Sequence, residues 1–232
     1  MELEKQQQQQ PPEMIRRAEQ LVEAMMAGRD ASHDAWHAYR VRDLALSLAR
    51  EEGLQDTNNL QIVELAALLH DIGDYKYTKD FVEDTGIVEK FLEEVEVEEG
   101  KREKILSIIK GMGFKHEVSG VAYVDSSLEF GVVQDADRLD AIGAIGIARC
   151  FTYGGSKNRV LHDPAIVLRQ ELSKEKYMNK DENQTTINHF HEKLFKLKDL
   201  MKTKAGKRRA EKRHKFMKDY VNEFYEEWSG RA

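Results

Sequence analysis

The stretch AALLHDIGDYKY, Ala66 to Tyr77, decides how this chain of 232 residues is interpreted. Its first half is rich enough in Ala and Leu to form a buried helix, yet that helix ends in His70 and Asp71. Burying an ionised carboxylate without a partner is costly, so such a group becomes neutral, forms an ion pair or binds a cation. The rest of the sequence must therefore supply a partner for this pair.

Composition indicates a soluble, intracellular protein. Hydrophobic residues make up 41% of the chain and charged residues 34%, which allows a sizeable core under a heavily charged surface. The net charge of −6 argues against general nucleic-acid binding. The single cysteine, Cys150, cannot form an internal disulfide or a multi-cysteine zinc site, which indicates a reducing compartment.

The N-terminal segment MELEKQQQQQPP, residues 1–12, is polar and Gln-rich, and lacks the apolar core of a secretory signal. It cannot bury enough surface to order itself, so we predict a disordered tail. No apolar run approaches the ~20 residues that span a bilayer, and we expect a cytoplasmic protein with no membrane partner. Residues 13–232 show no internal repeat or linker and are predicted to form one domain, as a monomer or a homodimer.

Helical periodicity of the apolar residues, without any convincing strand-like alternation, predicts an all-α fold. The third helix, through Leu65, is expected to be capped by Asn58 or Asn59. The other expected helices cover residues 13–27, 34–52, 86–99, 101–110 and 130–151, followed by two C-terminal helices through Ile187 to Leu197 and through Met217 to Trp228. The expected connections are loops at residues 111–120 and 152–164 and a turn at Thr203–Gly206.

The segment 130–151 is expected to form one long buried helix. Gly143 and Gly146 would let a neighbouring helix approach this one closely, at some cost in helix propensity.

Metal-ligating residue types lie on three helix faces that are otherwise apolar. His37 continues the apolar stripe of the second helix. His70 and Asp71 end the third helix, and Asp137 lies in the most hydrophobic helix of the chain. Two imidazoles and two carboxylates that converge would satisfy one another by holding a divalent cation.

This mixed nitrogen and oxygen set favours a transition metal, namely Mn²⁺, Fe²⁺, Co²⁺, Ni²⁺ or Zn²⁺, over Ca²⁺. It leaves coordination positions free for water and a substrate oxygen, as a hydrolytic site requires. Each signal alone has another interpretation: a lone His on an apolar face is often a core residue, and Asp137 could instead pair with Arg138 or Arg149.

The segments SHDAWHAYRV (32–41), LLHDIGD (68–74) and QDADRLDAIGAIGIAR (134–149) resemble the motifs of the HD-domain metal-dependent phosphohydrolases. His37 matches the first His of the family pattern, His70 and Asp71 its His-Asp pair, and Asp137 its last Asp. FTYGGSKNRVLHDP (151–164) and the C-terminal segment are similar to a small stand-alone subgroup. The resemblance implies a single HD-domain helical bundle with additional C-terminal helices over residues 13–232.

The resemblance also implies the chemistry of the site. His37, His70, Asp71 and Asp137 would bind one divalent metal ion, with Mg²⁺ less suited than the transition metals. A single ion is expected because the interval between the His-Asp pair and the last Asp contains only one further histidine, His116.

Besides His70 and Asp71, Asp74 is the candidate catalytic residue, because it lies one turn beyond His70 and could orient or deprotonate a water molecule. It could equally begin the following turn. Substrate phosphate needs cationic or hydrogen-bonding partners, and the candidates are Arg40, Lys115, Arg138, His33 and His116. Each of these could instead be an ordinary surface ion pair or an exposed loop histidine.

Two polar segments allow more than one interpretation. Residues 154–159 could cradle an anion or gate the substrate, although an ordinary loop is the favoured interpretation. The basic run KTKAGKRRAEKRHK, residues 202–215, could serve nuclear import or nucleic-acid binding. Because the same helix carries apolar residues on its other face, a solvated helix face is favoured and no nucleic-acid partner is expected.

The sequence therefore predicts a metal-dependent phosphohydrolase whose substrate is a nucleotide or a similar small phosphorylated metabolite. The alternative is a nucleotide-binding sensor that retains the metal pocket without turnover. The acid/base residue separates the two, because an enzyme needs Asp74 or a substitute and a sensor does not.

Overall fold

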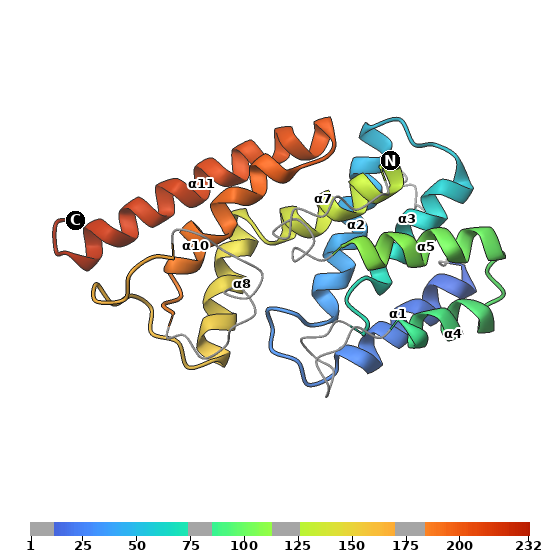
Figure 1. Cartoon of the computed structure of the whole chain (residues 1–232), viewed down its shortest axis with the longest axis horizontal. Helices are drawn as coiled ribbons and strands as arrows, with labels where there is room; N and C mark the ends of the chain where they lie inside the picture. Colours follow the sequence, from blue (N-terminus) through green and yellow to red (C-terminus); the bar gives the residue numbers. More distant parts are fainter. Residues whose placement is uncertain (1–11, 74–84, 113–125, 170–183) are drawn as a thin grey trace, which may run out of the picture.

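The computed structural model describes residues 12–73, 85–112, 126–169 and 184–232. These ranges contain helices and no strand, so the predicted all-α fold is confirmed (Figure 1). Within the same ranges no helix is long and apolar enough to cross a membrane. Residues 1–11, most of the predicted tail, lie outside the described residues.

The bundle begins with α1 (Glu13–Met26), α2 (Ala35–Glu51), α3 (Thr57–Leu69), α4 (Gly86–Glu94) and α5 (Glu99–Gly111). It continues with α7 (Leu128–Asp140), α8 (Gly143–Ser156), α10 (Asn188–Glu192), the 3₁₀ helix η1 (Leu194–Leu200) and α11 (Lys204–Trp228). Helix α2 packs against α3 and α7, while α11 packs against α7, α8 and η1. In Figure 1, α8, α10 and α11 lie to one side of the bundle that contains α1 to α5.

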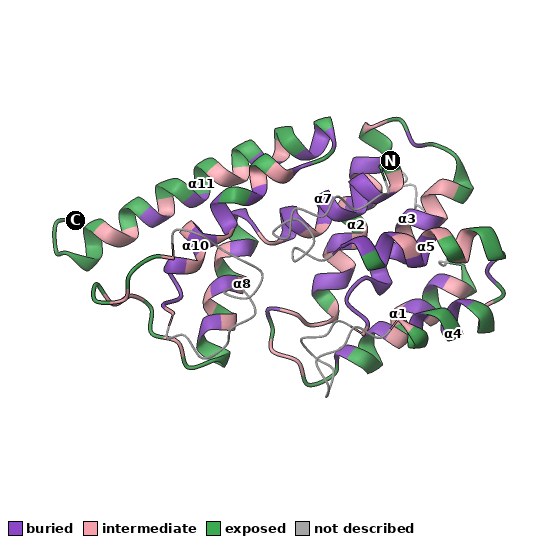
Figure 2. Cartoon of the chain, in the orientation of Figure 1, coloured by how far each residue is buried: buried purple, intermediate pink, exposed green. Residues whose placement is uncertain are grey.

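Helix α3 is the centre of the core. Its residues Leu65 to Leu69 are fully buried, and it contacts α1, α2, α5 and α7 (Figure 2). A helix that is apolar all round is stable only when neighbours cover every face. The end of α3, where the His-Asp pair follows, is therefore held from several sides.

Local capping determines where α2 and α3 begin. The side chain of Asp34 accepts a hydrogen bond from the His37 backbone at 3.3 Å, which places His37 in the first turn of α2. For α3 the expected cap was wrong: Asp56, not Asn58 or Asn59, is the N-cap. Its carboxylate accepts from both asparagine backbones, at 2.9 and 3.1 Å.

The prediction of a single helix over 130–151 is wrong, because α7 ends at Asp140 and a separate helix, α8, begins at Gly143. Gly143 adopts φ +77°, a conformation that other residues rarely take. A Cβ at Gly143 would lie 2.9 Å from Cγ of Arg213 in α11, and a Cβ at Gly146 would overlap the carbonyl of Ala141. The glycines therefore permit a change of direction, and Gly143 also permits the close approach of α11.

Other boundaries also differ from the prediction. Helix α8 runs to Ser156, so the first part of the expected loop 152–164 is helical. Helix α4 ends at Glu94, where Glu96 follows with φ 56°. The helix expected through residues 187–197 is divided into α10 and η1 at Lys193, whose φ and ψ are −131° and −58°. The expected turn Thr203–Gly206 already belongs to the start of α11.

Helix α11 is attached to the bundle by a buried carboxylate. Asp135 accepts hydrogen bonds from the backbones of Lys202 and Thr203, both at 2.8 Å, and from the Thr203 hydroxyl at 2.7 Å. Part of the basic run also contacts the bundle, because Arg209 pairs with Glu51 and Arg213 donates to the Leu139 carbonyl. The basic run is therefore partly structural and not only a solvated face.

Candidate metal centre and adjoining pocket

The predicted ligands converge where three helix ends meet. His37 lies in the first turn of α2, Asp137 in the last turn of α7, and His70 and Asp71 directly after α3. Gly73, with φ +80°, follows the pair. Because α2 packs between α3 and α7, these ends meet although their residues are far apart in the sequence.

The donor atoms are close enough to share one cation. One ligand atom each of His37, His70 and Asp137 lies within 4.8 Å of the other two. Carboxylate oxygens of Asp71 lie 3.5 Å from Nε2 of His37 and 3.5 Å from Nε2 of His70. An oxygen of Asp137 lies 3.5 Å from the first of these nitrogens and 3.7 Å from the second. The four groups thus surround one small volume.

His70 is oriented as a metal ligand requires. Its Nδ1 lies 2.8 Å from the Ala67 carbonyl, so this nitrogen carries the proton and donates it. Its Nε2 is buried and has no hydrogen-bond partner among the described residues. A buried nitrogen lone pair directed at two carboxylates is unfavourable by itself and is satisfied by a cation between them. The residues present therefore fit a divalent metal ion.

Asp140 contacts His37 on the side of the ring that faces away from the other predicted ligands. Its carboxylate lies 2.8 Å from Nδ1 of His37, accepts two hydrogen bonds from Arg40 at 2.8 and 3.0 Å, and accepts one from Arg149 at 2.9 Å. Only 2% of its side chain is exposed. A carboxylate behind a ligating histidine sets the tautomer and direction of the ring.

The pKa values reflect these contacts. Burial and the nearby Arg149 lower the pKa of His37, but its bonds to Asp140 and Asp71 outweigh them, so the pKa is raised overall. For Asp140, burial acts to raise the pKa, but the bonds from His37 and Arg40 outweigh it, so the pKa falls well below its ordinary value. Asp140 is therefore ionised at neutral pH, and Nδ1 of His37 must carry the proton between them.

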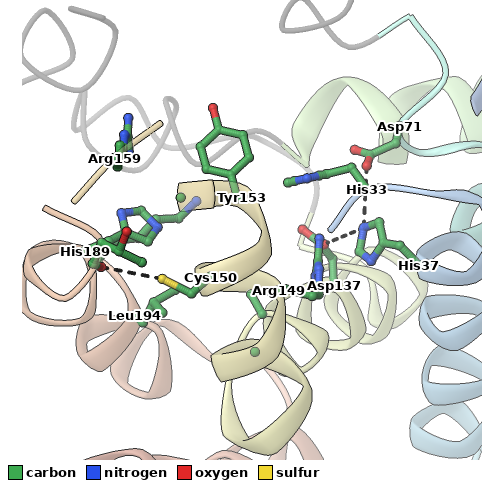
Figure 3. Close-up of a pocket in the computed structure, with 15 residues that line it drawn as sticks. His33, His37, Asp71, Asp137, Arg149, Cys150, Tyr153, Arg159, His189 and Leu194 are labelled. Atoms are coloured by element: carbon green, nitrogen blue, oxygen red, sulfur yellow. Dashed lines mark hydrogen bonds and ion pairs between the residues drawn. The ribbon is translucent and has the colours of Figure 1, made fainter. Parts of the chain in front are cut away.

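A pocket opens from the predicted metal ligands toward α8 and α10 (Figure 3). His37, Asp71 and Asp137 line one side, and Arg149 lies beside them. Figure 3 shows Arg159 and His189 on the opposite side of the pocket, with Tyr153 between the two sides. The cavity thus has acidic predicted ligands on one side and cationic side chains on the other.

Of the predicted substrate-binding residues that the structure describes, one lines the pocket and two do not. His33 lines the pocket, with its ring centroid 5.7 Å from that of Tyr153. Arg40 does not line it, and its guanidinium is bound to Asp140. Arg138 does not line it either and donates to the Leu200 carbonyl. The remaining candidates, Asp74, Lys115 and His116, lie outside the described residues.

Sequence reasoning missed Asp140, which orients the predicted ligand His37, and several residues that line the pocket. Asp140 follows Asp137 by three residues, a spacing that puts a second acid near the same end of α7 and could have drawn attention to it. Arg149 was considered only as an ion-pair partner. His189 and Lys193 lie four residues apart, a spacing that puts two side chains on one helix face. Only the packing of α10 places them at the pocket.

Comparison with known proteins agrees with the all-α fold and with the HD-domain family. The pattern described as "HD domain" matches residues 35–142, a range that includes all four predicted ligands. The chain is 33% identical over 219 residues to YpgQ of Bacillus subtilis, which covers 93% of this chain and 96% of that protein. The structure of that protein was solved in complex with ADP, and the two folds superpose with a TM-score of 0.71 at 30% identity, covering 94% and 100% of the two chains.

Two further crystal structures are similar over almost the whole chain. A protein from Lactobacillus plantarum is 36% identical, with a TM-score of 0.80 and coverage of 94% of this chain and 97% of that one. An HD-superfamily hydrolase from Bacillus thuringiensis is 39% identical, with a TM-score of 0.67 and coverage of 93% and 96%. With its all-α fold and its converging His, His-Asp and Asp residues, the chain belongs to the HD-domain family and has the fold of the HD-superfamily hydrolases.

Proposed function

We propose that the protein is a metal-dependent phosphohydrolase that cleaves a phosphate ester or anhydride of a nucleotide or a similar small phosphorylated metabolite. The observation that carries the proposal is the buried Nε2 of His70, which has no hydrogen-bond partner among the described residues and faces the carboxylates of Asp71 and Asp137. This donor set suits one transition-metal ion and leaves positions open for ligands.

A divalent ion held there would supply Lewis acidity and an activated water for attack on phosphorus. The chain's own residues would supply the rest. Arg149, which lines the pocket beside Asp137 and is held by Asp140, would bring positive charge to a phosphoryl group bound in the pocket. His33 offers a ring nitrogen to the same space, and Asp74 remains the proposed residue that orients or deprotonates the water.

A nucleotide is the preferred substrate class because YpgQ, a relative similar over nearly the whole chain, was crystallised with ADP. The cation-lined wall of the pocket offers the charge that a nucleotide phosphate requires.

The test is a hydrolysis screen of purified protein against nucleoside mono-, di- and triphosphates and sugar phosphates. Each substrate is tested with Mn²⁺, Co²⁺, Ni²⁺, Zn²⁺ and Mg²⁺. We expect metal-dependent release of phosphate or pyrophosphate from at least one nucleotide, and none from the His70→Ala variant. If metal-loaded wild type turns over none of these substrates but binds nucleotide tightly, the protein is a sensor and the proposed activity is wrong.

A further inference from the structure

We propose that the pocket wall formed by Arg159, Lys193 and Thr186 is a second anion-binding subsite, separate from the metal centre. It would bind a phosphoryl group of the substrate other than the one that is attacked. The assignment to a substrate rests on the proposed function, whereas the subsite itself is argued from the geometry alone.

The backbone at the end of α8 fixes the position of Arg159. Asn158 adopts φ 54°, the amide of Asn158 donates to the Gly155 carbonyl at 3.1 Å, and the amide of Arg159 donates to the Gly154 carbonyl at 2.9 Å. These two bonds form a Schellman motif, a rigid way to end a helix. Arg159 is therefore presented by a defined turn.

The same segment is joined to the residues that precede α10. The amide of Thr186 donates to the Val160 carbonyl at 2.9 Å, and that of Ile187 donates to the Leu161 carbonyl at 3.0 Å. Arg159, which precedes Val160, and Thr186 both line the pocket. Main-chain hydrogen bonds thus hold together the two segments that carry Arg159 and Thr186.

Among the described residues, the charged side chains of this wall are cations. The only carboxylates that line the pocket among the described residues are Asp71 and Asp137, both metal ligands. Arg159 makes no ion pair with any described carboxylate, and its guanidinium lies 5.5 Å from the centre of the Tyr153 ring. Burial lowers the pKa of the adjacent His189 to about 3, and the cations Lys193 and Arg159 contribute. An anionic group would pair with Arg159.

A buried hydroxyl supplies the second observation that points to a ligand. Thr186 is 2% exposed and lines the pocket, and its Oγ1 has no hydrogen-bond partner among the described residues. Gly154 leaves the room for it, because a Cβ there would overlap that oxygen. A buried hydroxyl without a partner is costly, and a ligand oxygen at the wall would accept its hydrogen bond.

A ligand that reaches both the metal ligands and this wall carries two anionic groups. A diphosphate or longer phosphate chain meets that requirement, whereas a monophosphate meets only half of it. The structure thus favours a substrate with a condensed phosphate over a simple phosphate monoester.

The test is equilibrium binding of methylenediphosphonate, a diphosphate analogue that cannot be hydrolysed, to Mn²⁺-loaded protein by calorimetry. Methylphosphonate is the single-anion reference. We expect the diphosphonate to bind at least tenfold tighter, and Arg159→Gln to weaken it by about ten- to a hundredfold, the usual effect of losing a charge-assisted hydrogen bond. Methylphosphonate binding should not change in this variant.

Lys157→Gln is the matched control, because Nζ of Lys157 also lies 5.5 Å from the Tyr153 ring centre but Lys157 does not line the pocket. Thr186→Val should weaken diphosphonate binding several-fold without lowering Tm, since it removes an unsatisfied hydroxyl at nearly constant volume. Equal affinity for the two phosphonates, or equal affinity of Arg159→Gln and Lys157→Gln, would overturn the subsite. The binding measurement does not require hydrolysis. Failure of the hydrolysis screen would therefore refute the proposed activity without affecting the evidence for the anion-binding subsite.

Discussion

The carboxylate of Asp140 lies 2.8 Å from Nδ1 of His37, and this contact joins the last residue of α7 to the first turn of α2. The same carboxylate binds Arg40 and Arg149, so one buried side chain orders a predicted metal ligand and a cation of the pocket wall. Asp140 is a positioning residue, because it acts on the site through the groups that it holds.

Asp140→Asn should therefore weaken metal binding although Asp140 itself is not a ligand. An amide at this position can present its NH₂ group to Nδ1 and favours the wrong tautomer of His37. Loss of such an outer partner typically costs about 10–100-fold in metal affinity. The measurement is a competitive Mn²⁺ or Zn²⁺ titration, with the exposed Asp43→Asn in α2 as control. Unchanged affinity in Asp140→Asn would show that Arg40 and Arg149, not His37, are what this carboxylate serves.

Metal removal should destabilise the wild type, because the ion binds only the folded chain. We expect Mn²⁺ or Zn²⁺ to raise Tm in wild type, and chelation to reverse the increase. His70→Ala and Asp71→Ala should lose both the increase and the bound metal, measured by melting curves and elemental analysis. His33→Ala should keep both, since His33 lines the pocket without belonging to the ligand group. Equal metal content in all four proteins would place the ion elsewhere.

The raised pKa of His37 predicts opposite pH effects with and without metal. In metal-free protein a raised histidine pKa gives stability that is fully present below about pH 6.5 and is lost as pH rises through the folded value. Metal binding needs the neutral ring, so metal-dependent stabilisation should increase over the same interval. The pKa values of His189, His191 and His214 are lowered. Their effect on the pH dependence of stability therefore falls below about pH 6.5, outside the interval in which His37 is expected to act.

The measurement is denaturant unfolding from pH 6.5 to 8, with chelator and with saturating Zn²⁺. Stability should fall with pH in the first series and rise in the second. His37→Gln should remove the slope of the metal-free series. A flat metal-free series in wild type would mean that Asp140 and Asp71 do not favour the charged, doubly protonated form of His37 in the folded protein.

Asp74 and Asp137 should differ in what their amide variants lose. Asp137→Asn should weaken the metal itself, because its carboxylate oxygen lies 3.5 Å and 3.7 Å from the two histidine nitrogens. Asp74→Asn should keep the metal and slow turnover by about 10²–10⁴-fold, the usual contribution of a general base. Metal content and kcat are measured on the best substrate of the screen. Full activity of Asp74→Asn would transfer the role to His33, His116 or the metal alone.

Two adjacent glycines in the last turns of α8 should respond differently to alanine. A Cβ at Gly154 would overlap Oγ1 and approach Cγ2 of Thr186, whereas a Cβ at Gly155 meets nothing within 4 Å. Gly155→Ala should be neutral or stabilise by up to about 1 kcal/mol through helix propensity. Gly154→Ala should destabilise by about 1–3 kcal/mol through overpacking. Denaturant unfolding checks both, and similar stabilities would mean that the wall carrying Thr186 is free to move away.

Much of the local structure followed from the amino-acid sequence. Apolar periodicity located α1, α2, α3 and the apolar face of α11, because a helix that buries one stripe must repeat it every 3.6 residues. The four predicted ligands were recognised as a group because each is a polar residue at a position where the pattern calls for an apolar one. The all-α class followed from the helical periodicity, and the HD family followed from the resemblance of the segments 32–41, 68–74 and 134–149 to the family motifs. Both are confirmed.

Boundaries were the weaker part, because a cap or a break depends on single residues. Asp56 competes with two nearby asparagines for the start of α3, and all three are good caps. The break between α7 and α8 depends on the positive φ of Gly143, and glycine in a helical pattern is compatible with either a break or a close contact.

The segment QDADRLD shows most clearly what only the tertiary structure decided. Its three aspartates look alike in the sequence, and each residue of a helix points about 100° away from the one before. Asp135 faces the start of α11, Asp137 faces the metal ligands and Asp140 faces His37 and two arginines. Helical geometry by itself shows that their directions differ. What each carboxylate does depends on which helix packs against its face, and that partner comes from a distant part of the chain.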